Sequence, residues 1–176
     1  LANKGAITYF FHSIWPELSA KMQDLHIDVV GKNPPTWLLE LSQRDMRVHV
    51  PGFVDDVRPY FQQATVFVCP ITEGGGTRLK ILDALAMGMP MVSTTFAASG
   101  LGLKDKEHLL LADTSDEFIA KTIEILSNKS MREALSRRGH EIVKEKFSWG
   151  VIAHSLLGAY EDARYLASKQ SRSAGQ

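Results

Sequence analysis

Short runs of β-branched and apolar residues alternate along this chain with longer segments that repeat apolar residues at helical spacing. Several runs are apolar almost throughout, which is typical of parallel strands buried on both faces. The alternation indicates an α/β fold with a doubly wound parallel sheet and helices on both faces. The predicted strands are residues 27–31, 47–50, 65–69, 91–94 and 108–111.

Helical periodicity predicts the segments between and after these runs. In the second predicted helix we expect Pro34 in the first turn, where its missing N–H costs little. In the fifth we expect Ser115 to be the N-cap. One domain would cover residues 1–167, followed by a polar, frayed tail over residues 168–176. The predicted helices are residues 6–24, 34–44, 55–63, 77–87, 115–128, 130–146 and 148–167.

Composition narrows the class of protein. The length of 176 residues, with 44% apolar and 23% charged residues, suits one globular domain with a proper core. A net charge of zero gives no indication of nucleic acid as a partner. No apolar run approaches the roughly 20 residues that span a bilayer. A single cysteine, Cys69, fits a reducing compartment, so we expect a cytoplasmic protein. Peripheral attachment of the full-length parent to a membrane stays open as an alternative.

The segment EGGGTRLKILDALAMGMP, residues 73–90, follows a predicted strand directly. In doubly wound sheets, ligands bind at the carboxyl ends of the strands, so this segment lies where a ligand would bind. Its three glycines, Gly74, Gly75 and Gly76, allow positive φ and close approach of the backbone. The helix that starts near Thr77 would offer free N–H groups and a partial positive charge, which suit phosphate.

Three charged side chains add to this pattern. Arg78 and Lys80 supply donors, and the arginine suits a bidentate phosphate contact. Asp83 follows Lys80 by three positions, on the same helix face, where a carboxylate can accept hydrogen bonds from ribose hydroxyls. The segment thus predicts a cradle for a diphosphate and a ribose.

Simpler interpretations stay open. The glycines can form a plain loop, and Lys80 and Asp83 can form a surface ion pair worth tenths of a kcal/mol. The segment matches neither the P-loop pattern nor the glycine fingerprint of dinucleotide-binding folds.

The order of VVG, PGFVDDVRPYFQQATVFVCP, EGGGTRLKILDALAMGMPMVST, HLLLAD and FSW resembles the C-terminal, donor-binding domain of retaining GT-B glycosyltransferases of the group 1, family 4 type. The resemblance covers almost the whole chain, and its most specific part begins at the glycines. It implies a Rossmann-like half of a GT-B fold. The implied function is transfer of a sugar, with retention, from a nucleotide diphosphate sugar to an acceptor in glycan or polysaccharide synthesis. It implies no cofactor and no metal site.

The resemblance also implies roles for residues in the glycine-rich segment. Glu73 would contact the transferred sugar, and the amides from Gly74 to Thr77 would hold the diphosphate and sugar hydroxyls. Asp83 would bind the ribose. Arg78 would stabilise charge developing on the leaving diphosphate. Lys80 would grip the diphosphate or act as a structural ion-pair residue.

The backbone of Gly52, Phe53 and Val54 would lie near the base by the same resemblance. Two departures affect the acids. The ribose acid is usually a glutamate and here is the shorter Asp83, and nine residues instead of the usual seven separate it from Glu73. A displaced Glu73 would lose its sugar contact.

The family's enzymes have a second, N-terminal domain that binds the acceptor. By resemblance, this chain lacks that domain and also the first strand of its own, so we expect weak donor binding and no turnover. Exposed apolar residues near the C-terminus, such as Leu156, Leu157 and Tyr160, would allow a dimer of this piece. The alternatives are a stand-alone nucleotide-binding or interaction domain without catalysis, and a sugar-nucleotide epimerase of the same architecture.

Overall fold

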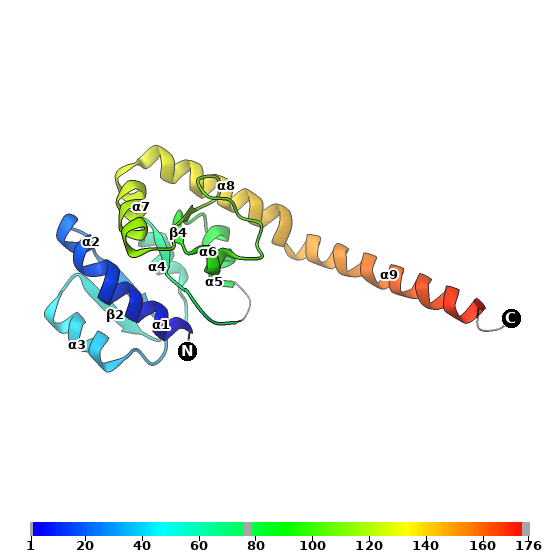
Figure 1. Cartoon of the computed structure of the whole chain (residues 1–176), viewed down its shortest axis with the longest axis horizontal. Helices are drawn as coiled ribbons and strands as arrows, with labels where there is room; N and C mark the ends of the chain where they lie inside the picture. The colour runs from blue at the N-terminus through cyan, green and yellow to red at the C-terminus, as the bar shows by residue number, and fades with distance from the viewer. Residues whose placement is uncertain (1, 76–78, 174–176) are drawn as a thin grey trace. The chain divides into compact units, whose positions relative to one another are not determined.

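The computed structural model describes residues 2–75 and 79–173 (Figure 1). The chain forms two compact units, residues 1–140 and 141–176, and the predicted site falls in the first. The helices are α1 (Ala2–Tyr9), the π-helix η1 (Phe10–Ile14), α2 (Trp15–Lys21), α3 (Thr36–Arg44), α4 (Arg58–Gln63), α5 (Leu79–Ala86), α6 (Thr95–Ala98), α7 (Ser115–Ser127), α8 (Lys129–Phe147) and α9 (Trp149–Ser173).

The strands all pair in parallel, as predicted, but they form two sheets. One sheet has the order β1-β2 and the other β3-β4-β5. The α/β class with parallel sheets and helices on both sides is confirmed, and the predicted single sheet is divided between β1 and β3. The strands are β1 (Ile27–Val30), β2 (Val48–Gly52), β3 (Phe67–Cys69), β4 (Met91–Ser93) and β5 (Leu110–Leu111).

The first helical segment, predicted over residues 6–24, starts earlier and has three parts. The π-helical part ends where Trp15 N–H bonds to the Phe10 carbonyl. Pro16 follows at once. A proline inside a regular helix has no N–H to donate and its ring clashes with the carbonyl four residues back. A wider turn directly before Pro16 relieves that clash, and both Phe10 and Phe11 still face the core.

Two predicted helix starts are corrected. Thr114, not Ser115, is the N-cap of α7: its hydroxyl accepts the Glu117 N–H, and the Glu117 side chain accepts the Thr114 N–H. This reciprocal pair needs Ser/Thr and Glu three residues apart, and only Thr114 has that spacing. Pro34 is not in the first turn of α3, because Pro35 is the extended N-cap residue and the helix starts after it.

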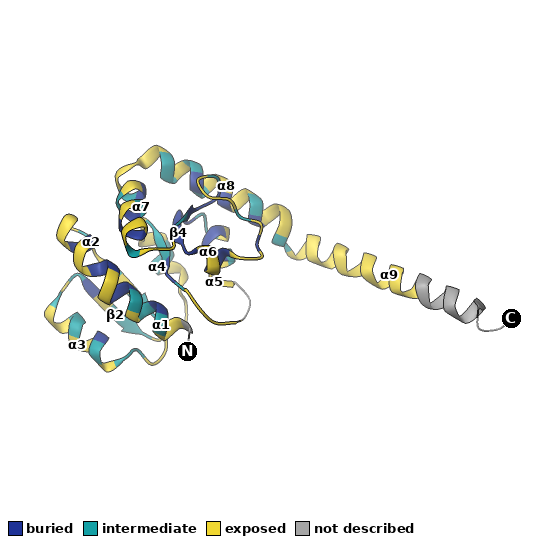
Figure 2. Ribbon diagram, viewed as in Figure 1, coloured by how far each residue is buried: buried dark blue, intermediate teal, exposed yellow. Residues whose placement is uncertain are grey.

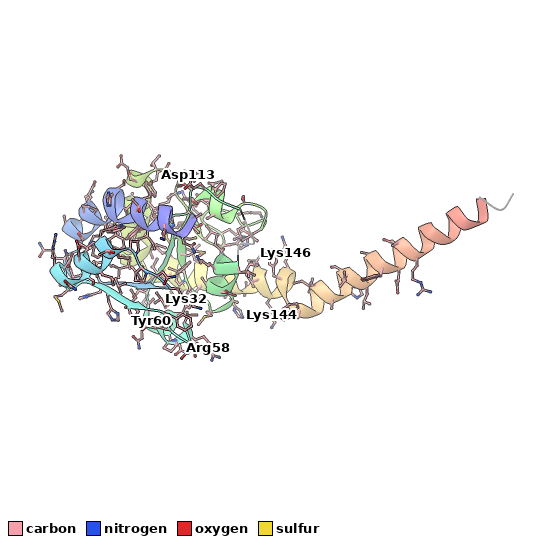
Figure 3. All side chains as sticks on the ribbon, turned by 90° about the horizontal axis from the view of Figure 1, so that it is seen from below. Lys32, Arg58, Tyr60, Asp113, Lys144 and Lys146 are labelled. Carbon is pink, nitrogen blue, oxygen red and sulfur yellow. The ribbon has the colours of Figure 1, made fainter. Side chains whose placement is uncertain are left out.

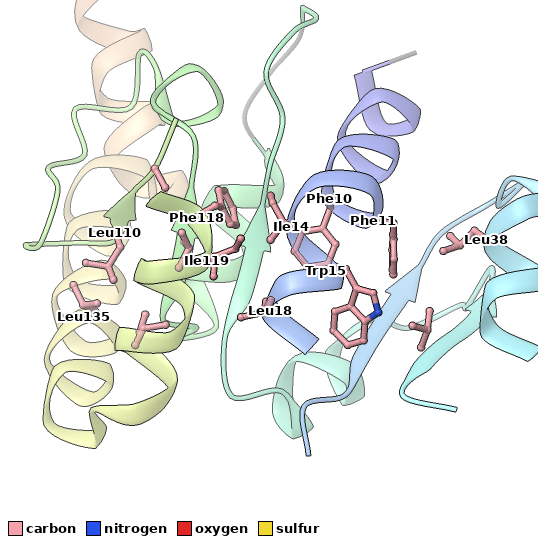
Figure 4. Close-up of a cluster of buried hydrophobic side chains, with 14 residues drawn as sticks. Phe10, Phe11, Ile14, Trp15, Leu18, Leu38, Leu110, Phe118, Ile119 and Leu135 are labelled. Carbon is pink, nitrogen blue, oxygen red and sulfur yellow. The ribbon is translucent and has the colours of Figure 1, made fainter. Parts of the chain in front are cut away.

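One hydrophobic core joins the two sheets. Figure 4 shows η1 and α2 contributing Phe10, Ile14 and Leu18 next to Phe118 and Ile119 of α7. The same cluster includes Val48 of β2 and Val92 of β4. Helices η1, α2 and α7 therefore bridge the sheets through side chains rather than through backbone hydrogen bonds.

In the second unit, α9 runs through Ser173, past the predicted helix end at residue 167. The described part of α9 is exposed along its length (Figure 2). Its exposed side chains include Trp149, Leu156, Leu157 and Tyr160. Among the described residues, no helix is both long and apolar enough to cross a membrane.

Candidate functional site

The glycine-rich segment follows β3, as predicted, and leads into α5. Gly74 has φ +108°, a conformation that favours glycine, whereas Gly75 does not have a positive φ. Glu73, Gly74 and Gly75 are exposed. The predicted site residues Gly76, Thr77 and Arg78 lie outside the described residues, so their roles stay predictions.

Side-chain hydrogen bonds connect the carboxyl ends of β3, β4 and β5. The Thr94 hydroxyl, after β4, donates to the Ile71 carbonyl at the base of the glycine-rich segment, and accepts the Ala97 N–H at 3.0 Å. Thr95 donates its N–H and its hydroxyl to the two carboxylate oxygens of Asp113, at 2.8 and 2.7 Å. Asp113 follows β5 and is labelled in Figure 3. One end of the glycine-rich segment is thus anchored to the buried Thr94.

The start of α1 lies against this segment, a juxtaposition that sequence reasoning missed. Lys80 Nζ donates to Asn3 Oδ1 at 2.5 Å. A Cβ added to Gly5 would lie 3.2 Å from Glu73 Oε1, so the glycine leaves room for that carboxylate. Lys4, between them, is exposed. The available signal was the sequence NKG just before an apolar helix, which our predicted helix, starting at residue 6, left out.

The Lys80–Asn3 bond bears on the alternative that Lys80 and Asp83 form a surface ion pair. Lys80 and Asp83 form no ion pair in the part of the chain that the structure describes. Both side chains line one cavity of about 650 Å³. Their shared helix face is therefore as predicted, while Ile81 and Leu85 of the same helix are buried.

The same cavity extends along the sheets. Its lining includes Ile27, Asp28 and Val30 of β1 on one side and Val66, Phe67 and Val68 on the other. Asp83 thus lines the same cavity as the facing edge strands of both sheets.

The segment predicted to lie near a base, residues 52–54, begins at the last residue of β2. Gly52, the last residue of β2, has φ +79°, and its carbonyl accepts the Gly31 N–H at 2.9 Å. Phe53 is 59% exposed, and Lys32 Nζ lies 4.3 Å from the centroid of its ring. Val54 is half-buried. Lys32, labelled in Figure 3 with Arg58 and Tyr60 of α4, is a cation at the carboxyl end of β1 that sequence reasoning missed.

Metal-ligating side chains do not gather in the part of the chain that the structure describes: no group of three or more His, Cys, Asp or Glu residues could hold a metal ion there. The described polar groups of this region include the exposed cation Lys80 and the acids Glu73 and Asp83, and Lys4, next to Asn3 in the chain, is exposed. This arrangement can hold a small ligand that carries both negative charge and hydroxyl groups.

These features define a parallel α/β domain. Its glycine-rich segment follows a strand, and a lysine and two acids lie in or after that segment. The chain belongs to the glycosyl transferases group 1 family, whose model matches residues 1–128.

Two curated relatives illustrate the match. The chain is 34% identical over 153 residues to the lipopolysaccharide core biosynthesis glycosyltransferase LpsE of Rhizobium meliloti, covering 84% of this chain and 44% of the relative. It is 29% identical over 167 residues to the phosphatidyl-myo-inositol mannosyltransferase of Mycobacterium leprae, covering 88% of this chain and 42% of the relative. The chain thus spans less than half the length of these relatives.

Solved structures confirm the fold. The C-terminal domain of a group 1 glycosyl transferase protein (LpcC) from Francisella tularensis superposes with a TM-score of 0.69 at 20% identity, covering 82% of this chain and 80% of that one. The Anabaena protein Alr3699/HepE, solved in complex with UDP, superposes with a TM-score of 0.75 at 15% identity, covering 88% of this chain and 46% of that one.

Proposed function

We propose that this chain is the donor-binding domain of a glycosyltransferase that takes a sugar from a nucleotide diphosphate sugar. The observation that carries the proposal is the meeting of Glu73 and Lys80 with the start of α1 beside the glycine-rich segment of a group 1 family member, with Asp83 lining the same cavity as Lys80. The Anabaena relative solved with UDP supports a nucleoside diphosphate as the ligand.

The diphosphate would lie on the backbone amides from Gly74 to Thr77, with cations around it. Lys80 uses one of its three ammonium donors on Asn3, which leaves two for phosphate oxygens. Lys4, next to Asn3 in the chain, is a second exposed cation. Arg78 would be the third and the one suited to a bidentate contact.

Asp83 would accept hydrogen bonds from the ribose, and the backbone from Gly52 to Val54 would lie near the base. Glu73 would face the transferred sugar. Its Oε1 lies beside Gly5 of α1, where a larger side chain would crowd it.

The proposed reaction breaks the bond between the anomeric carbon and the diphosphate and forms a bond to an acceptor hydroxyl on the same face, with retention. The leaving diphosphate would take the proton of that hydroxyl. The chain's contribution is electrostatic: loop amides, Lys80 and Arg78 stabilise the negative charge that grows on the diphosphate. We expect no metal and no cofactor.

The acceptor site would lie in the part of the parent enzyme that this chain does not include, so we expect this chain alone to bind donor and not to turn over. LpsE is named for lipopolysaccharide core biosynthesis, which favours a glycan or glycolipid acceptor. A cytoplasmic location and a dimer of this piece through α9 stay predictions. Sedimentation equilibrium of the chain, with Leu156→Ser and Leu157→Ser as the dimer-breaking variant, tests the second.

Calorimetric titration with UDP, GDP and ADP tests the proposed function. We expect one of the three to bind, and binding to weaken at least tenfold in Asp83→Asn, because a lost hydrogen bond to a charged acceptor costs about 1.5–3 kcal/mol. Glu124→Gln, an exposed acid-to-amide change on α7, is the matched control and should bind as the parent does. Equal binding by both variants, or none by the folded parent, would contradict the cradle.

A further inference from the structure

Lys32 and Phe53 meet where β1 and β2 end. The Gly31 N–H donates to the Gly52 carbonyl at 2.9 Å, and this bond brings together the two residues that directly follow the glycines. Lys32 Nζ lies 4.3 Å from the centroid of the Phe53 ring. The parallel pairing of β1 with β2 therefore positions this cation over this ring, at the carboxyl ends of both strands.

The space beside this pair is open. A Cβ added to Gly31 or to Gly52 would meet no atom within 4 Å. Phe53 is 59% exposed, and Lys32 is exposed as well. A single exposed apolar side chain is ordinary on a protein surface. An aromatic ring, a cation and two glycines with free space beside them together form a surface that can take a flat, polar ring.

The charge of Lys32 is not used by an acid. In the part of the chain that the structure describes, no carboxylate forms an ion pair with it. Arg58, which follows in the same loop as Phe53, differs: its Nε donates to the Asp56 carboxylate at 2.9 Å. An ammonium group held over the face of a ring keeps hydrogen-bond donors for a ligand. Lys32 is therefore the cation of this edge that is available to one.

The pair also follows closely on residues of the cavity that holds Asp83. Val30, two residues before Lys32, and Val57, four residues after Phe53, line that cavity together with Asp83. In the proposed function Asp83 binds the ribose, and a base is joined to its ribose by a single bond. A base that leaves the ribose toward the ends of β1 and β2 therefore meets the exposed ring and the ammonium group.

A lysine and a phenylalanine read a base in different ways. Uracil and guanine present a carbonyl oxygen where cytosine and adenine present an amino group. The ammonium group has three donors and no acceptor, so it can bond to the carbonyl but meets the amino group donor to donor. An unpaired donor that loses its water lowers affinity. The ring of Phe53 makes no such distinction, because every base has a face on which it can stack.

We propose that Lys32 determines which nucleotide this site accepts, by donating a hydrogen bond to the carbonyl oxygen of uracil or guanine and disfavouring cytosine and adenine. Phe53 adds stacking that is the same for all four bases. The inference rests on the proposed function and deepens it. There, only the backbone of residues 52–54 lies near the base, whereas here two side chains, one of them from the loop after β1, contact it.

Titration calorimetry with two matched pairs, UDP with CDP and GDP with ADP, tests the assignment, and weak ligands are measured by competition with the strongest one. The chain should bind UDP or GDP at least about tenfold more tightly than its amino partner. Lys32→Met should weaken that nucleotide about tenfold and change its partner less than about twofold. Phe53→Leu should weaken both members of the pair alike, about fivefold. Lys144→Met, at an exposed lysine of the second unit, is the matched control and should change neither.

Equal weakening of all four nucleotides in Lys32→Met would mean that Lys32 holds phosphate and would overturn the assignment. Tighter binding of CDP or ADP than of its carbonyl partner would overturn it too, as would a preference that Lys32→Met leaves unchanged. The proposed function fails separately. Binding that is lost in Asp83→Asn but keeps its base preference in Lys32→Met leaves the cradle standing and removes only the role of Lys32. If the folded chain binds none of the four, both proposals fall.

Discussion

Lys80, at the start of α5, donates a 2.5 Å hydrogen bond to Asn3, at the start of α1, across 77 positions of the chain. The bond orients the ammonium group next to the glycine-rich segment. It also makes the first turn of α1 part of the candidate site.

Replacing Lys80 by methionine should weaken binding of the preferred nucleoside diphosphate about thirtyfold, since a charge-assisted hydrogen bond contributes about 2 kcal/mol. Asn3→Ala keeps the charge and loses only its orientation, so it should weaken binding by less, about threefold. Calorimetric titration of both variants measures the difference. Equal losses would mean that Lys80 acts only by holding α1.

Gly52 and Gly31 offer a matched pair of glycines at the carboxyl ends of β2 and β1. A Cβ would meet nothing within 4 Å at either position, but only Gly52 has a positive φ, +79°. Gly52→Ala should therefore destabilise the fold by about 1–2 kcal/mol. Gly31→Ala should be neutral or stabilise slightly, by up to about 1 kcal/mol, because alanine restricts the unfolded chain. Urea unfolding measures both, and similar costs at the two positions would contradict the positive φ of Gly52 as the source of the difference.

The N-cap of α7 gives a second paired test. Thr114→Ala should cost about 1 kcal/mol of unfolding free energy, because it removes the acceptor of the Glu117 N–H. Ser115→Ala, one position later, should cost little because alanine is the better helix former. Thermal unfolding followed by circular dichroism compares the two. A larger loss in the serine variant would contradict the observed capping box.

The free energy of unfolding at acid pH should depend on the contact between Asp45 and Arg47. The Arg47 guanidinium donates two hydrogen bonds of 2.8 Å to the Asp45 carboxylate and a third, of 3.0 Å, to the Ser19 carbonyl of α2. The hydrogen bonds from Arg47 lower the pKa of Asp45 from 3.8 to about 2. The folded state therefore binds this proton more weakly than the unfolded state, and the pair stabilises the fold above the unfolded pKa.

This stabilisation should decline as pH falls from about 4 to about 2. Because the pair is partly exposed to solvent, we expect its contribution to be about 1 kcal/mol. Asp45→Asn should lose that amount at neutral pH and show a flatter decline in unfolding free energy between these pH values. Glu124→Gln, whose carboxylate is exposed, is the control. An unchanged slope in Asp45→Asn would rule out this contact as a source of the acid dependence.

Much of the secondary structure could be predicted because each helix or strand has its own pattern of apolar residues. The apolar run at residues 91–94 forms β4, and all three residues of this strand are buried. The strand predicted over residues 108–111 shortened to Leu110–Leu111. The physical reason lies in a turn: the Lys104 N–H bonds to the His108 ring at 3.1 Å, and the Lys104 carbonyl accepts the His108 N–H. That ring–backbone contact has no local periodic signal.

Only the part of the candidate site that lies within one segment of the sequence could be predicted. Gly74, Lys80 and Asp83 fall in one segment, and their positions at the end of β3 and on one face of α5 follow from short-range rules. The contacts of Asn3 and Gly5 with that segment depend on how α1 packs, which no pattern around residue 80 contains. The division of the sheet cannot be predicted from the strand sequences, which are the same whether or not a neighbour lies beside them; only the resemblance, which implies a missing first strand, points to it.

The π-helical turn of η1 lies between two parts of one continuous helical segment that contact different partners. Before it, Asn3 and Gly5 of α1 face the glycine-rich segment, and after it, Trp15 and Leu18 of α2 face the core. If all of Phe10–Ile14 followed the α-helical repeat of about 100° per residue instead, one end would turn by roughly a quarter of a turn relative to the other. The fold could then keep either its core or its ligand contacts in register, but not both. The wide turn of η1 therefore takes up one extra residue while both ends of the segment keep their partners.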